Sequence, residues 1–117
     1  MATPNILSVS TINGNTTVAA LTTSAITMVT NAAASGKIIK LNALYISNSN
    51  TSNNNSVTVD VYRSATAYRI ATNVTIPIAS TLDLISKSLY LLEGDALRVT
   101  GSASSSLEAV CSFEEIS

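Results

Sequence analysis

The chain of 117 residues has no histidine, no tryptophan and a single cysteine, Cys111. Without histidine, the most adaptable general base and the commonest metal ligand are missing. Serine triads, Cys-His pairs and zinc sites of the usual types are therefore excluded. A single cysteine also excludes an intrachain disulfide, so the fold has to be stabilised by its core.

Charge is also scarce. Charged residues make up 11% of the chain and the formal net charge is −1, whereas an average globular domain is about 25% charged. The few lysines and arginines are scattered and form no basic stripe, which argues against binding to nucleic acid or to an anionic membrane. Because the buried centres of protein interfaces are depleted in charge, this composition favours a protein that contacts other proteins.

Long apolar runs are missing as well. No run approaches the roughly 18 residues that a membrane helix needs. The first five residues lack the basic segment and apolar run of a secretory signal, so we expect synthesis and folding in a cytoplasm. Apolar residues nevertheless make up 46% of the chain, enough for one domain with a substantial core.

What the sequence does contain is a series of short runs in which apolar and polar residues alternate. The clearest is VTVDVYR at residues 57–63, and runs of Ser, Thr, Asn and Gly separate it from its neighbours. Alternation with a period of two is typical of strands with one buried face. Many short, evenly spaced strands predict an all-β protein, and a single jelly-roll-like antiparallel sandwich of roughly eight to ten strands accounts for them best.

Residues 16–30 fit two structures. Val18, Leu21, Ala25 and Met28 have nearly helical spacing, but the many threonines favour strands. We therefore favour a hairpin over a helix here. The predicted strands are residues 16–21, 25–31, 37–48, 57–63, 67–71, 74–78, 82–86, 89–92, 96–100 and 107–113.

Residues 1–14 are predicted to form an N-terminal arm that precedes a sandwich domain of residues 15–117. Asn13-Gly14 is a strong turn signal that would end the arm. An apolar arm needs a covering surface, either its own domain or a neighbouring subunit. Its apolar residues are the first interface candidates: Ile6, Leu7, Val9 and Ile12.

The strand at residues 37–48 is apolar on both faces. Leu41 and Tyr45 lie on one face in a regular strand, whereas Leu44 and Ile46 lie on the other. A bulge near Asn42 would reverse the faces midway along the strand. The alternative is that Leu44 and Ile46 form a second interface.

The sequence offers few candidates for catalytic or metal-binding residues. The carboxylates could supply a glycosidase pair or a calcium site, but no D-x-D-x-D-G loop is present, and Glu93-Gly94-Asp95 is typical of a tight turn. Cys111 falls on the apolar face of its strand, where a thiol behaves as a small hydrophobic group. We assign no catalytic, cofactor or metal site and expect no enzymatic activity.

Several segments resemble, in order, small structural proteins of tailed-bacteriophage virions, particularly phages of cyanobacteria. They are residues 44–48 (LYISN), 57–63 (VTVDVYR), 76–77 with 81–82, 91–99 (LLEGDALRV) and 107–116 (LEAVCSFEEI). The resemblance implies a β-sandwich protein of the virion, made in the host cytoplasm. It also implies a capsid decoration (cement) protein or a tail or fibre component.

The first hypothesis is a decoration protein that binds the major capsid protein in the assembled shell, as a homo-oligomer with a trimer favoured. The second places the same domain in the tail, neck or a fibre. The third, of a different class, is a carbohydrate-binding adhesion module, in which the tyrosines (Tyr45, Tyr62, Tyr68 and Tyr90) would stack on sugars.

Overall fold

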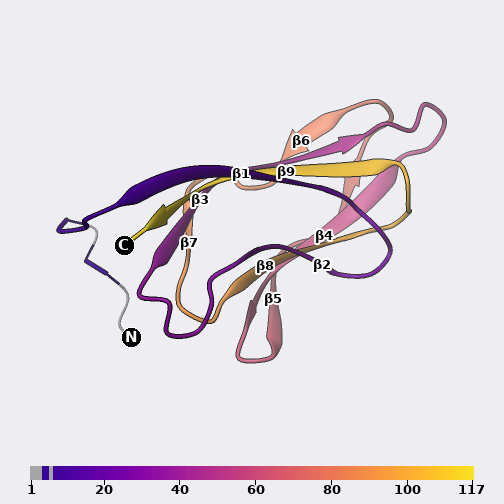
Figure 1. Ribbon diagram of the computed structural model, residues 1–117. Helices are drawn as coiled ribbons and strands as arrows, with labels where there is room; N and C mark the ends of the chain where they lie inside the picture. Colours follow the sequence, from indigo (N-terminus) through magenta and orange to yellow (C-terminus); the bar gives the residue numbers. More distant parts are fainter. Residues whose placement is uncertain (1–3, 6) are drawn as a thin grey trace.

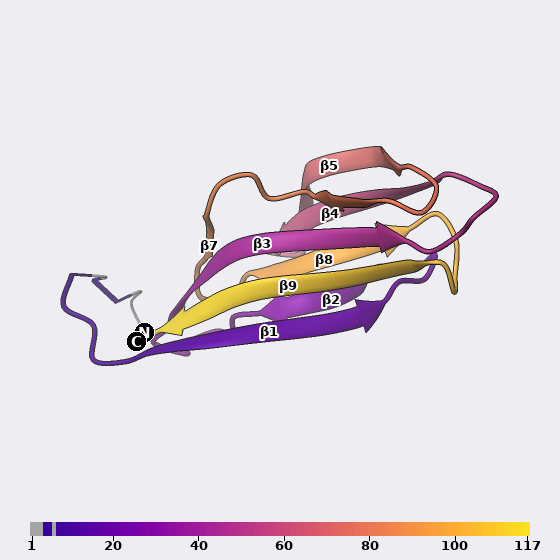
Figure 2. The same cartoon turned by 90° about the horizontal axis from the view of Figure 1, so that it is seen from above.

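The computed structural model describes residues 4–5 and 7–117, and these contain nine β-strands and no helix. The strands form two antiparallel sheets that pack face to face (Figure 1, Figure 2). None of the described residues belongs to a helix long and apolar enough to cross a membrane.

Sheet A consists of β1 (Ile12–Ala20), β9 (Leu107–Ile116), β3 (Ile38–Asn48), β6 (Thr81–Asp83) and β7 (Leu89–Leu91). Sheet B consists of β2 (Ile26–Thr30), β8 (Ala96–Gly101), β4 (Asn55–Arg63) and β5 (Thr66–Ile76).

The order of the strands is that of a jelly roll. In sheet A the order is β1-β9-β3-β6, and β7 pairs with an earlier part of β3 than β6 does. In sheet B the order is β2-β8-β4-β5. The chain crosses between the sheets repeatedly, so that its first and last strands become neighbours. The predicted all-β jelly-roll-like sandwich is confirmed.

The predicted hairpin in residues 16–31 is correct in its strands and wrong in their pairing. β1 pairs with β9 in sheet A, whereas β2 pairs with β8 in sheet B. The connection is an arch that enters the core through Leu21, whose side chain is 1% exposed. The local sequence favours two strands joined by a turn. The two strands nevertheless belong to different sheets, so the inward-facing side chains of each strand are covered by the opposite sheet.

β1 also begins earlier than predicted. It starts at Ile12, and the expected turn at Asn13-Gly14 lies within the strand, opposite Glu115 and Glu114 of β9. The boundary of the arm therefore lies before residue 12 and not after residue 14. Pairing with the long strand β9 supplies backbone hydrogen bonds that a turn at Asn13-Gly14 would lack.

Residues 67–71 and 74–78, predicted as separate strands, belong mainly to the single strand β5. The strand changes its register against β4 at two places, and Asn73 adopts a left-handed backbone conformation with φ of 47°. Pro77 follows directly after the end of β5, as expected for a residue that cannot donate to a ladder.

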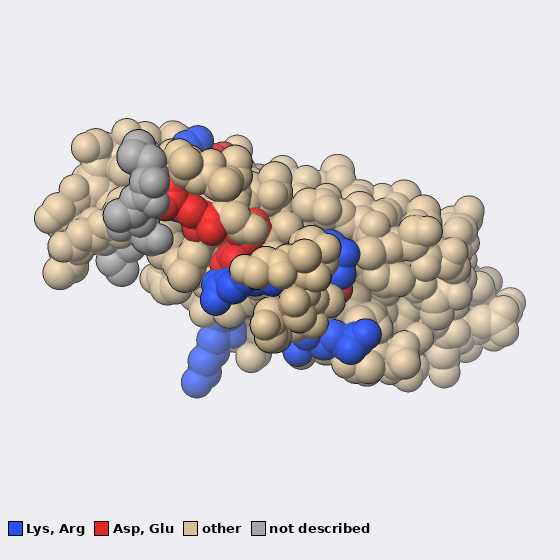
Figure 3. All heavy atoms as spheres, turned by 90° about the horizontal axis from the view of Figure 1, so that it is seen from below, with Lys and Arg blue, Asp and Glu red and all other residues tan. Residues whose placement is uncertain are grey.

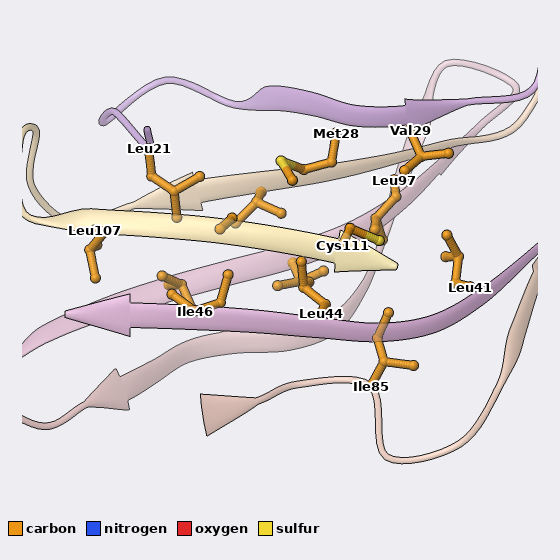
Figure 4. Packing of buried hydrophobic residues seen from close by; sticks show 14 of the residues in the cluster. Leu21, Met28, Val29, Leu41, Leu44, Ile46, Ile85, Leu97, Leu107 and Cys111 are labelled. Carbon is orange, nitrogen blue, oxygen red and sulfur yellow. The ribbon is translucent and has the colours of Figure 1, made fainter. Parts of the chain in front are cut away.

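The register of β3 shifts between Leu41 and Ala43, so Asn42 is a bulge. Leu41 and Leu44 consequently face the same side, the space between the sheets, while Tyr45 points outwards. Figure 4 shows Leu44 and Ile46 in this space together with Leu97 of sheet B. The bulge alternative is confirmed.

The two sheets bury one continuous apolar cluster. Its large side chains come from both sheets and are almost completely shielded from solvent. They include Leu21, Leu41, Leu44, Ile46, Val57, Val59, Ile76, Leu91, Leu97, Val99 and Leu107. The outward faces and the loops therefore carry whatever function the molecule has.

Candidate interaction surfaces

The segment before β1 exposes apolar side chains while its backbone is fastened to the end of β9. Leu7 is 91% exposed and Val9 is half-buried, and Ile12, the first residue of β1, is 56% exposed. The backbone N–H groups of Ser10 and Thr11 donate to the carbonyl oxygen of Ser117 at 2.8 and 2.9 Å. Ile6, the fourth interface candidate of the arm, lies outside the described residues. The segment is thus held against the sandwich with Leu7 available to a partner.

The other two interface candidates, Leu44 and Ile46, are placed in the core. Both side chains are completely buried between the sheets, so their prediction as an interface is wrong. The physical reason is the bulge at Asn42, which turns these side chains inwards.

An exposed apolar row crosses the outer face of sheet A. Val18 of β1 pairs with Val110 of β9, which pairs in turn with Tyr45 of β3. These side chains share a face and are 70%, 37% and 45% exposed, respectively. Sequence reasoning missed this row, because which strands are neighbours is a property of the topology. The one local signal was the apolar residue on the outer face of the last strand, Val110.

One end of the sandwich is formed by four loops without charged residues: residues 21–25, 49–54, 77–80 and 102–106. Backbone hydrogen bonds join them, including Ser49 N–H to the Ser106 oxygen (2.8 Å) and Gly101 N–H to the Thr22 oxygen (2.8 Å). In Figure 3, this end, at the right, shows uncharged atoms, and the charged side chains gather in the middle and left. Such a surface can meet a partner at a small desolvation penalty.

Two buried carboxylates are each held by an arginine. Asp95 is 1% exposed. Its carboxylate accepts hydrogen bonds from Nε of Arg63 at 2.7 Å and from the backbone N–H of Leu92 at 2.8 Å. The hydrogen bond from Arg63 lowers the pKa of Asp95 more than burial raises it. The group therefore remains a carboxylate that fastens the turn before β8 to the end of β4.

The second pair lies on the outer face of sheet B. Asp60 accepts hydrogen bonds from Nε and Nη2 of Arg98 at 2.9 and 3.3 Å. The Arg98 guanidinium also lies 4.0 Å from the ring centre of Tyr62, a cation–π contact. The described residues contain no group of three or more acidic or cysteine side chains that could hold a metal ion. Asp60 thus joins β4 to β8, whereas Asp95 joins the turn before β8 to the end of β4.

Cys111 is fully buried in the core. Burial, with a smaller contribution from the charge of Asp83, raises the pKa of its thiol to about 11. Since the thiolate is the reactive form, this group is inert at neutral pH.

The tyrosines do not form one platform. Tyr62 points to the outer face of sheet B, whereas the side chain of Tyr68 in β5 is directed to the opposite side. Tyr68 and Tyr90 instead line an open depression of about 330 Å³ between the edges of the two sheets, together with Val61, Arg63 and Leu89.

Comparison with known proteins yields a similarity of fold. No family model and no curated protein matches the chain. Among solved structures, it is similar to a subunit of Bacillus endospore appendages, which are described as a novel family of disulfide-linked pili. The sequence identity is 14%, the similarity covers 92% of this chain and 87% of that one, and the TM-score is 0.57. At this identity the likeness shows that the two share a β-sandwich architecture.

Proposed function

We propose that this chain is a structural protein of a bacteriophage virion, a capsid decoration protein that binds the major capsid protein and stabilises the assembled shell. It acts through shape and surface, without a cofactor and without catalysis. The observation that carries the proposal is the combination of exposed apolar side chains with a surface that is poor in charge. Residues 1–36, which include Leu7 and Val18, contain no charged residue. The resemblance of residues 36–116 to phage virion proteins supplies the context.

Mass action provides the mechanism. A protein that binds the assembled shell, and not its free subunits, stabilises the shell by the free energy of binding. Many copies bound to one lattice add avidity, so each contact can be modest. Small apolar contacts such as that of Leu7 are then sufficient.

The test is co-sedimentation of the purified protein with expanded capsids. Deletion of residues 2–9 leaves the pairing of Thr11 with Ser117 and all of β1 in place, so we expect a folded domain that no longer sediments with capsids. Leu7→Asp is expected to weaken sedimentation, whereas Ile70→Asp, at a residue 42% exposed on the far sheet edge, serves as the matched control. Undiminished binding by the deletion variant would remove the segment from the mechanism.

A position in the tail, neck or a fibre is the second candidate, and the pilus subunit of the same fold supports it, because that protein builds an extended assembly. Copy number separates the two positions. A number per virion comparable to that of the major capsid protein indicates the shell, and a much smaller number indicates the tail.

A carbohydrate-binding module is the third candidate. The depression between Tyr68 and Tyr90, with Arg63 beside it, is the feature that favours it. Glycan-array binding that is lost in Tyr68→Ala and retained in Tyr62→Ala would support this function, because Tyr62 points to the other face of sheet B.

A further inference from the structure

The edges of the two sheets differ in how well they are protected against pairing with another strand. β6 and β7 have three residues each, and β2 has five residues and a register shift. β5 is long, but it carries Arg69 and its register against β4 shifts twice. Short edges, charges and bulges are the devices that prevent edge-to-edge association.

β1 has none of these devices. It is nine residues long, and its pairing with β9 runs without a shift from Ile12 to Ala20. It contains no proline and no charged residue. Figure 2 shows β1 along the lower boundary of sheet A, with no strand beyond it.

The hydrogen bonds to β9 determine which backbone groups of β1 are free. Thr11 and Ser117 exchange two bonds of 2.9 Å, and Leu21 N–H donates to the Leu107 oxygen at 2.9 Å. Because bonded pairs alternate along an antiparallel ladder, the odd-numbered residues of β1 face β9 and the even-numbered ones face away. Among the described residues, no backbone group outside the strand ladders bonds to the even-numbered set. That set is Ile12, Gly14, Thr16, Val18 and Ala20.

A row of free N–H and C=O groups is a template for pairing with another β-strand, and the sequence of β1 fits its own antiparallel copy. A twofold axis at Thr16 sets Thr16 against Thr16, Gly14 against Val18, and Ile12 against Ala20. These pairs bring no like charges together, and threonine pairs are favourable across strands. An added Cβ on Gly14 would meet no atom within 4 Å, so the larger Val18 of a second copy has room beside it.

We propose that two copies of this chain associate through β1, antiparallel about Thr16, so that their A sheets join into one continuous sheet. About ten backbone hydrogen bonds would form at the junction. The exposed rows of Val18, Val110 and Tyr45 in the two copies would then lie on the same face of the joined sheet, offset by four residues, because Val18 of one copy is set against Gly14 of the other. This pairing is isologous and closes as a dimer, in contrast to the trimer favoured in the decoration-protein hypothesis.

The first experiment is light scattering of the purified chain over a range of concentrations. The mass is expected to rise from 12.1 kDa toward twice that value. Thr16→Lys sets two like charges opposite each other and should raise the dimer dissociation constant about tenfold or more. Thr75→Lys, an exposed threonine on the protected strand β5, should leave the mass curve unchanged. Melting curves establish that both variants fold.

The second experiment locates the contact. The twofold axis brings the two Thr16 Cα atoms within about 5.5 Å, so Thr16→Cys should be cross-linked as a dimer by a short bismaleimide. Thr75→Cys should remain uncrosslinked, and the buried Cys111 contributes no background. A strictly monomeric or trimeric mass, or equal cross-linking of both variants, would overturn the proposal. Since capsid binding is measured separately by co-sedimentation, loss of that function would leave this result intact.

Discussion

Leu44 of β3 and Cys111 of β9 are directly paired in sheet A, and neither side chain is exposed to solvent. Their contact follows from the bulge at Asn42, since a regular β3 would turn Leu44 outwards. One irregular residue therefore decides which side chains of the second half of β3 face the core.

This relationship predicts opposite outcomes for neighbouring residues. Leu44→Ala should lower the free energy of unfolding by about 2–5 kcal/mol, because it leaves a cavity in the core. Tyr45→Ala, at a residue on the outer face, should lower it by about 1 kcal/mol or less. Chemical denaturation of both variants measures the difference. A larger loss in Tyr45→Ala would show that β3 has the opposite register.

Cys111 should be protected from alkylation in the folded protein. At pH 8, its thiol is buried and, with a pKa of about 11, almost wholly protonated. Iodoacetamide labelling should therefore follow the fraction of unfolded chain as urea is added, whereas Thr16→Cys should label at once. Rapid labelling of the native wild type would contradict the buried position.

The same pKa predicts a loss of stability in alkali. An unfolded cysteine loses its proton near pH 8.5, whereas the folded thiol retains it up to about pH 11. The unfolded state therefore binds fewer protons in this window, and the free energy of unfolding should fall as the pH rises through it. Cys111→Ala should show a shallower decline over the same range.

Asp95 should make the free energy of unfolding depend on pH in the acidic range. Its pKa is lowered in the folded state, chiefly by Arg63, so its contribution to stability is complete above about pH 4 and is lost as the pH falls further. Asp95→Ala also leaves the Leu92 N–H without its acceptor and should lower stability at pH 7 by about 2–4 kcal/mol. Asp95→Asn, which retains an oxygen, should lose less. Equal losses would mean that the hydrogen bond to Leu92 contributes little.

The stability of the fold should depend on the Arg98 guanidinium, which is the partner of the buried Asp60 carboxylate. Arg98→Met leaves Asp60, 4% exposed, without its partner and should lower the free energy of unfolding by about 3–5 kcal/mol. Adding Asp60→Leu should restore much of this loss, because the uncompensated buried charge is gone. Lys87→Met, at an exposed lysine between β6 and β7, is the control and should change stability by about 0.5 kcal/mol or less. Similar losses in the Arg98 and Lys87 variants would contradict a special role for the pair.

Sequence reasoning located most strands because alternation is a local property. It misplaced the partner of β1 and the start of that strand, since these depend on β9, which lies far along the chain. For β3 it reduced the choice to a bulge or an interface, and only the pairing with β9 selected the bulge. The exposed row of Val18, Val110 and Tyr45 was beyond its reach, because it joins residues from three separate strands.

The amino-acid sequence by itself determined the β-class of the fold, the absence of histidine chemistry and of an intrachain disulfide, and a surface poor in charge, because each depends on residue type and spacing alone. The tertiary structure decided which strands lie at the edges, that Leu44 and Ile46 belong to the core, and that the free groups of β1 point outwards. These are consequences of how distant segments pair. Burial and exposure are defined only once every strand has its neighbours.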